Sequence, residues 1–85
     1  MPANFVELNV FPNPVSDQLF IEASLLENEI VKISLVNIMG QTVKIETTSG
    51  TDIRSTIEVS ELAAGTYFLR LETEVGAAIR KVVIF

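Results

Sequence analysis

The sequence predicts an all-β fold, a sandwich of seven antiparallel strands connected as a Greek key, and three observations support it. Short segments rich in Val, Ile, Leu and Thr alternate apolar and polar residues at a period of two. Turn residues separate these segments at regular spacing, and no segment shows the apolar period of a helix. The chain has 85 residues, 48% of them hydrophobic, which is enough for one small core. We therefore expect a single domain over residues 1–85, with residues 1–4 as a linker or an artificial start.

The boundaries of the strands follow from the alternation and from the turn residues between them. The seven predicted strands cover residues 5–11, 18–23, 30–37, 42–48, 54–59, 66–74 and 78–85. The polar segments 27–29 and 49–52 are expected to be loops. Gly40 is expected to have a positive φ in a tight reversal between the third and fourth strands.

Alternation also predicts which side chains face the core. In the first strand, Val6 should face inward with the other apolar residues of its parity. In the fourth strand, Val43 and Ile45 should face inward, and Lys44 and Glu46 should face solvent.

Two prolines interrupt the chain after the first strand, in the segment Pro12-Asn13-Pro14. Each proline fixes its own φ, removes a backbone N–H donor and restricts the preceding residue to extended conformations. Such a segment cannot continue a ladder in the middle of a sheet. We expect it to be a rigid crossing or an edge segment.

A corner of small residues precedes the sixth strand, with Leu62, Gly65 and Tyr67 in the spacing Leu-x-x-Gly-x-Tyr. This spacing suits a tyrosine corner, in which the Gly lets the backbone turn, the ring enters the core and the hydroxyl donates to a carbonyl a few residues back. Leu69 and Leu71 then share the inward face of the strand with the Tyr. The corner favours a sandwich of the immunoglobulin or fibronectin type.

The last predicted strand ends in Arg80, Lys81, Val82, Val83, Ile84 and Phe85, whose apolar residues fall on both faces. Periodicity therefore does not say which face of the strand is buried. One interpretation is a closing strand within the sheet, with a basic pair at its start. The other is an exposed edge that invites the addition of a further strand.

The composition argues against catalysis and against cofactor or metal binding. The chain has no His and no Cys, so the commonest general base, the strongest nucleophile and the usual zinc ligands are missing. The Glu side chains occupy outward positions or predicted loops, and the two polar loops supply too few carboxylates for a convincing calcium site. We predict no catalytic, cofactor-binding or metal-binding residue.

Binding functions also find little support in the composition. The net charge is −5 and the six basic residues are mostly scattered, which argues against nucleic acid as a partner. The chain has no Trp, so an aromatic platform for carbohydrate is barely available. Phe20 and Phe68 have strand neighbours that should face solvent, and they could form an exposed apolar patch if their strands adjoin. The alternative is that they are edge residues covered by a loop.

Taken together, these motifs resemble the type A C-terminal sorting domain of the type IX (Por) secretion system of Bacteroidetes. The early motif is matched by Phe11-Pro12-Asn13-Pro14, Asp17 and Leu19. The middle motif, an alternating strand that ends in a Gly turn, is matched by residues 31–43 with Gly40. The late motif is matched by Leu62, Gly65, Tyr67, Leu69 and Leu71, and the closing strand by residues 80–84. Asn37 stands where an Asp is frequent in the family, and Phe11 where a Tyr is frequent.

The resemblance implies a non-catalytic signal that directs a cargo protein across the outer membrane. The parent protein would reach the periplasm through an N-terminal signal peptide, and the domain would fold there and be recognised by the outer-membrane translocon. A sortase-like protease at the cell surface commonly removes such a domain, here with cleavage at or before residues near Met1–Val6, and many cargos are then attached to the surface. The chain ends on the terminal motif, as such a signal would.

The partners and location implied by this resemblance are correspondingly specific. The partners are the translocon, the protease and the N-terminal cargo domains of the parent chain, and an edge-strand dimer is a further option. The location is the periplasm in transit and then the cell surface or the medium. We expect the recognised surface at the last strand and its neighbours, because only there does the core leave the apolar pattern unexplained.

Other classes of function stay open at this point. A structural immunoglobulin- or fibronectin-like module of an extracellular enzyme or adhesin explains the fold equally well. It gives no reason, however, for Pro-Asn-Pro and an apolar terminus to occur together. A carbohydrate-binding module needs an aromatic platform, and an enzyme has the least support.

Overall fold

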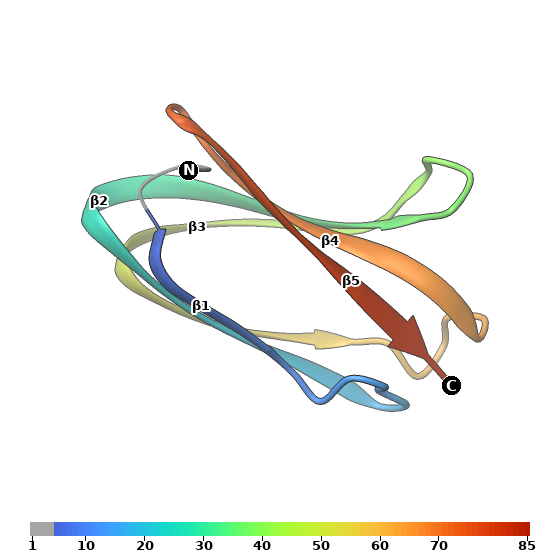
Figure 1. Cartoon of the computed structure of the whole chain (residues 1–85). Helices are drawn as coiled ribbons and strands as arrows, with labels where there is room; N and C mark the ends of the chain where they lie inside the picture. The colour runs from blue at the N-terminus through green and yellow to red at the C-terminus, as the bar shows by residue number, and fades with distance from the viewer. Residues whose placement is uncertain (1–4) are drawn as a thin grey trace.

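The computed structural model describes residues 5–85 and shows an antiparallel β-sheet that curls around its own core (Figure 1). The described residues form five strands: β1 (Phe5–Phe11), β2 (Gln18–Asn37), β3 (Thr42–Glu58), β4 (Gly65–Thr73) and β5 (Gly76–Ile84). The all-β class is confirmed. The prediction that residues 1–4 are a linker or an artificial start lies outside the described residues.

The sheet is built on β2, because three other strands pair with it. β1 pairs with the first part of β2 and β4 with its last part, while β3 follows its other edge. β5 pairs with β4, so the strand order is β1-β2-β4-β5 with β3 beside β2. Every strand pair is antiparallel.

The prediction of seven strands is wrong, because four of the predicted strands merge into two long bent ones. Segments 27–29 and 49–52, expected to be loops, lie inside β2 and β3. The register jumps there from Ser24↔Asp52 to Glu29↔Gly50, so several residues of β2 oppose a single residue of β3. Such an irregularity bends both strands while pairing resumes on either side. The result is one continuous curled sheet of five strands, and the predicted Greek-key sandwich is not shown.

The bend divides the sheet into two halves, which we name by their outermost strands. The β1 half contains β1, residues 18–24 of β2 and residues 52–58 of β3. The β5 half contains β4, β5, residues 29–37 of β2 and residues 42–50 of β3. Their inner faces enclose the core (Figure 1). The fully buried leucines and isoleucines are Leu19, Ile21, Ile33, Leu35, Ile53, Leu69, Leu71 and Ile84.

Predictions of the inward side chains fail at two places, and a local register shift explains each. Val6 is 64% exposed, because the register shifts between Phe5 and Glu7 and Phe5 takes the inward position. Ile45 is 62% exposed, because Val43 is an extra residue where β3 shifts register against β2. One additional residue exchanges the two faces of a strand.

The same shift places Lys44 and Glu46 opposite buried residues of β2, where Lys44 is half-buried and Glu46 stays exposed, as alternation predicts for Glu46. Both lie on the part of β3 that is opposite the buried Ile33 and Leu35 of β2. Lys44 Nζ lies 2.6 Å from the carboxylate of Glu61, and the Ser55 hydroxyl donates to the carboxylate of Glu46. Charged side chains on an edge strand such as β3 hinder the addition of another strand.

Candidate functional site

The segment between β1 and β2, residues 12–17, runs beside the end of β5. The backbone N–H of Val15 donates to the carbonyl of Val83 at 2.9 Å, and the N–H of Phe85 donates to the carbonyl of Val15 at 2.9 Å. These bonds form a parallel bridge between Val15 and Ile84. The segment that contains the two prolines is therefore an edge segment of the sheet.

The side chain of Asn13 extends this pairing by two further hydrogen bonds. Its Nδ2 donates to the carbonyl of Lys81 at 2.9 Å, and its Oδ1 accepts from the backbone N–H of Val83 at 3.0 Å. The amide thus offers β5 a donor and an acceptor, as a peptide group of a neighbouring strand would. We call these four hydrogen bonds, from Asn13 and Val15 to residues 81–85, the Asn13 clasp.

The prolines on either side explain why a side chain supplies these bonds. Pro12 and Pro14 have no backbone N–H, so this stretch of main chain cannot donate to β5 as an ordinary strand would. The peptide bonds before both prolines are cis. An Asn between two prolines replaces the missing main-chain pairing with its own amide.

The residues at the end of β5, which the clasp holds, differ in burial. Val82 and Ile84 are buried in the core, and Val15 on the opposing segment is also buried. Val83 is half-buried, and Phe85 is 76% exposed. The apolar residues on both faces thus have two explanations: one set fills the core, and the other lies outside it.

Arg80 occupies the position before the clasp begins. It lies opposite Leu69 of β4, which is fully buried, but Arg80 itself is exposed. Its guanidinium donates to the carbonyl of Ile79 at 3.0 Å. A charged side chain at an inward-facing position of an outer strand hinders the approach of another strand.

The tyrosine corner predicted from the sequence is confirmed. The Tyr67 hydroxyl donates to the carbonyl of Ala63 at 2.6 Å, and the side chain is 6% exposed. Gly65 has φ 153°, a conformation that L side chains rarely adopt. Leu62 is partly buried against the core. The corner fixes the start of β4, the strand against which β5 is paired.

The reversal between β2 and β3 is also confirmed, with Gly40 at φ 84°. The Asn37 Oδ1 accepts from the backbone N–H of Met39 at 2.9 Å and of Gln41 at 3.0 Å. These bonds need only a side-chain oxygen, which Asp and Asn both provide. The Asn37 Nδ2 also donates to Gln41 Oε1 at 3.0 Å. Asn is therefore a suitable replacement for the Asp that is frequent there.

Phe20 and Phe68 are both partly exposed, at 37% and 40%, but they have different neighbours. Phe20 lies opposite Phe11 and Thr56, with the two phenylalanine ring centres 5.7 Å apart. Phe68 lies opposite Val36 of β2 and a lysine of β5. The strand pairing therefore does not place Phe20 and Phe68 opposite each other, although each contributes to the surface of its own half.

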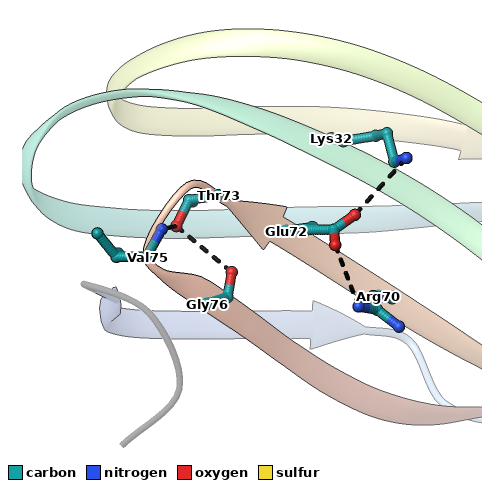
Figure 2. Close-up of polar contacts among 6 residues, drawn as sticks. All are labelled: Lys32, Arg70, Glu72, Thr73, Val75 and Gly76. Carbon is teal, nitrogen blue, oxygen red and sulfur yellow. Dashed lines mark hydrogen bonds and ion pairs between the residues drawn. The ribbon is translucent and has the colours of Figure 1, made fainter.

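Charged side chains cluster on the outer face of the β5 half (Figure 2). The Glu72 carboxylate lies between two cations, 3.6 Å from Lys32 Nζ and 3.1 Å from Arg70 Nη2. Lys32 projects from β2, and the other two residues project from β4. Figure 2 also shows the Thr73 hydroxyl bridging the turn to β5, where it accepts from Val75 N–H at 3.3 Å and donates to the Gly76 carbonyl at 3.4 Å.

Residues 5–85 contain no group of three or more metal-ligating side chains that could hold an ion. Within the same range, no helix has the length and apolar character needed to cross a membrane.

Sequence reasoning missed the contact between the early motif and the terminal strand. Asn13 contacts Lys81 and Val83 across 68 and 70 positions of the chain. The available signal was a side chain with both a donor and an acceptor, placed between two residues that lack N–H groups. It indicated the need for a replacement bond but not the strand that receives it.

Comparison with known protein families gives one match over most of the chain. The family described as "Secretion system C-terminal sorting domain" matches residues 9–85. The matched range contains the tyrosine corner, the Gly40 reversal and both sides of the Asn13 clasp. No curated protein matches the chain.

Proposed function

The chain belongs to the family of secretion-system C-terminal sorting domains and is a sorting signal for the type IX secretion system, and we propose that the end of β5, held by the Asn13 clasp, carries the surface that the export machinery recognises. The family is one of secretion signals and not of catalysts. Its role implies a longer cargo chain, contact with the type IX machinery, and export across the outer membrane to the cell surface or the medium.

The clasp is the observation that supports this location of the recognised surface. It joins the early Pro-Asn-Pro motif to the terminal strand by four hydrogen bonds. A plain spacer domain needs no such connection between the two motifs. Because Val82 and Ile84 are buried, the strand is fixed in the fold while Phe85 remains exposed. The recognised form is therefore the folded domain, with residues 80–85 displayed at its edge.

The rest of the proposal follows the transport route. The domain folds as one unit in the periplasm, and the outer-membrane translocon binds it there. A sortase-like protease then separates it from the cargo at or before residues near Met1–Val6, of which residues 1–4 lie outside the described part. A pairing of two copies would use the outer edge of β5 over residues 76–80, beyond the clasp, where Arg80 opposes the approach of a strand.

A secretion assay tests the location of the recognised surface. A signal peptide and a fluorescent reporter are placed before residues 1–85, and export is compared in cells with and without a working type IX translocon. Deletion of Lys81–Phe85 should retain the reporter in the periplasm. Normal secretion of this deletion would refute the proposal.

Point variants keep the test informative if the deletion unfolds the domain, since it removes the buried Val82 and Ile84. Phe85→Ser changes a side chain that is 76% exposed, and Met39→Ser changes one that is 79% exposed in the turn between β2 and β3, outside the last strand. We expect Phe85→Ser to lower export several-fold and Met39→Ser to leave it unchanged. Equal export of both variants would contradict a role for the end of β5.

A further inference from the structure

The outer face of the β5 half has a composition unlike the rest of the surface. Its residues are known from the strand pairing, which aligns them in rows across β2, β4 and β5. Phe68 lies between Val36 and Lys81, and Arg70 lies between Ser34 and Ile79. In the next row, Glu72 lies between Lys32 and Ala77. We call this surface the basic face.

The two outer faces of the curled sheet differ in the sign of their charge. The basic face carries Lys32, Arg70 and Lys81 against one acidic residue, Glu72, for a formal charge of +2. The outer face of the β1 half contains one basic residue and four acidic ones, for a formal charge of −3. These are Arg54, Glu7, Glu22, Asp52 and Glu58. A chain with a net charge of −5 therefore gathers half of its six basic residues on one side.

The charges on the basic face surround exposed apolar side chains. Phe68 is 40% exposed and Ile79 is 54% exposed, and each is directly opposite a basic residue on the neighbouring strand. Ile45, at the β3 end of the Ser34 row, is 62% exposed. An aromatic side chain and an Arg at the centre, with lysines toward the rim, is a typical composition of a protein–protein interface.

The single acidic residue of this face, Glu72, leaves the net charge of the face positive. Glu72 already lies within ion-pair distance of Lys32 and Arg70, which orients both cations on the surface (Figure 2). Among residues 5–85, no carboxylate forms an ion pair with Lys81. The face therefore presents a net positive potential around an apolar centre.

We propose that the basic face docks onto an acidic protein surface of the export machinery. The inference rests on the proposed function, and it assigns to that function a second contact surface beside the end of β5. Charge complementarity selects the partner, because the rest of the described surface would be repelled by an acidic one. The exposed apolar side chains favour a protein partner over a surface that is only charged. Their burial in a complementary interface lowers the free energy of the complex.

The docking also orients the domain. Lys81 belongs to the basic face, and its carbonyl accepts a hydrogen bond within the Asn13 clasp. A partner that covers the basic face therefore lies next to the displayed end of β5. Electrostatic attraction raises association rates, and complementary potentials disfavour binding in other orientations.

The test compares matched substitutions on the two faces, in the reporter fusion with the full chain. Lys32→Glu and Arg54→Glu each change the net charge by the same amount, but on opposite faces. Phe68→Ser and Phe20→Ser remove side chains of similar exposure, 40% and 37%, again on opposite faces. Lys32 lies outside residues 80–85, so its variant probes the basic face without changing the terminal strand.

We expect Lys32→Glu to slow the appearance of reporter in the medium about tenfold, within the range of electrostatic steering, and Arg54→Glu to have no such effect. Phe68→Ser should likewise reduce export more than Phe20→Ser. Thermal melting of each purified variant confirms that it folds. Equal export of Lys32→Glu and Arg54→Glu, whether normal or reduced, would overturn the proposal.

The outcomes separate this inference from the proposed function. If deletion of Lys81–Phe85 blocks export while Lys32→Glu does not, the end of β5 is recognised and the basic face is not. Two further measurements exclude other occupants. Sedimentation that shows a dimer broken by Lys32→Glu would replace the acidic partner with a second copy. Binding to phosphatidylglycerol vesicles but not to phosphatidylcholine vesicles, lost in Lys32→Glu, would replace it with a lipid surface.

Discussion

Substitution of Asn13 by Ala should destabilise the end of β5 selectively. The substitution removes two hydrogen bonds, of 2.9 Å to the Lys81 carbonyl and 3.0 Å from the Val83 N–H. Each is exposed, so water can hydrate the groups left behind, and the loss is about 0.5–1 kcal/mol for each bond. The total of about 1–2 kcal/mol corresponds to a melting temperature lower by about 5–15 °C in a domain of this size.

Two control variants make the measurement specific. Asn9→Ala changes an exposed asparagine of β1 that lies opposite Glu22, outside the clasp, and should leave the melting temperature nearly unchanged. Asn13→Asp keeps the acceptor for Val83 N–H but places an acceptor oxygen, in place of the donor, against the Lys81 carbonyl, so it should also be less stable than the wild type.

Amide hydrogen exchange locates the effect along the chain. In Asn13→Ala, the amides of Val83 and Phe85 should lose protection more than those of Leu69 and Leu71 in the centre of β4, because local opening precedes global unfolding. Equal melting temperatures for Asn13→Ala and Asn9→Ala would refute the reasoning. So would a uniform loss of protection across β4 and β5, because that pattern would mean that Asn13 does not act on the end of β5.

Two turns give further predictions for unfolding measured in urea. Tyr67→Phe removes the hydroxyl that donates to Ala63 but keeps the ring in the core, so we expect a loss of about 1 kcal/mol with an unchanged m-value; an unchanged midpoint would show that the corner does not depend on this bond. Gly40→Ala adds a Cβ where no atom lies within 4 Å, so its cost of about 1–2 kcal/mol comes from the φ of 84° alone. Gly40→Asn should cost less, since Asn tolerates this conformation, and a greater loss than for Ala would contradict the argument.

The centre of the core could be predicted from the sequence because its strands are regular there. Ile33 and Leu35 of β2 lie opposite Leu71 and Leu69 of β4, and all four are fully buried. Alternation identifies such residues without knowledge of the strand order, since each has apolar neighbours two positions away. The tyrosine corner was predictable for a similar reason, because its geometry depends on a few residues that are close in sequence.

Register shifts limited the prediction of which side chains face the core and of how many strands the sheet has. A bulge such as the one at Val43 needs no characteristic residue, yet it reverses which side chains face the core beyond it. The polar segments 27–29 and 49–52 had the composition of loops. They remain within strands because the pairing of β2 with β3 resumes on both sides of the bend, and Leu26, Glu27 and Asn28 at the bend are exposed to water.

The candidate site was predictable in its parts but not in its assembly. The sequence indicated that Pro-Asn-Pro is a rigid crossing or an edge segment and that the last strand has two apolar faces. The hydrogen bonds that join them end on main-chain groups of Lys81 and Val83. Main-chain groups are the same at every residue, so a sequence carries no record of which of them a distant side chain will contact.

The protection of the strand edges bears on how such a domain is recognised. Asn13 and Val15 form hydrogen bonds with the end of β5. The Arg80 guanidinium donates to the carbonyl of the preceding residue, Ile79. Lys44 and Glu46 are charged residues of β3 opposite the buried Leu35 and Ile33, and both have polar partners. These features oppose the addition of another strand, which would bind through the backbone with little regard to sequence. Under our proposal, the folded domain offers a partner a set of side chains on a fixed surface, at the end of β5 and on the basic face. Selective recognition depends on such side chains and not on backbone pairing.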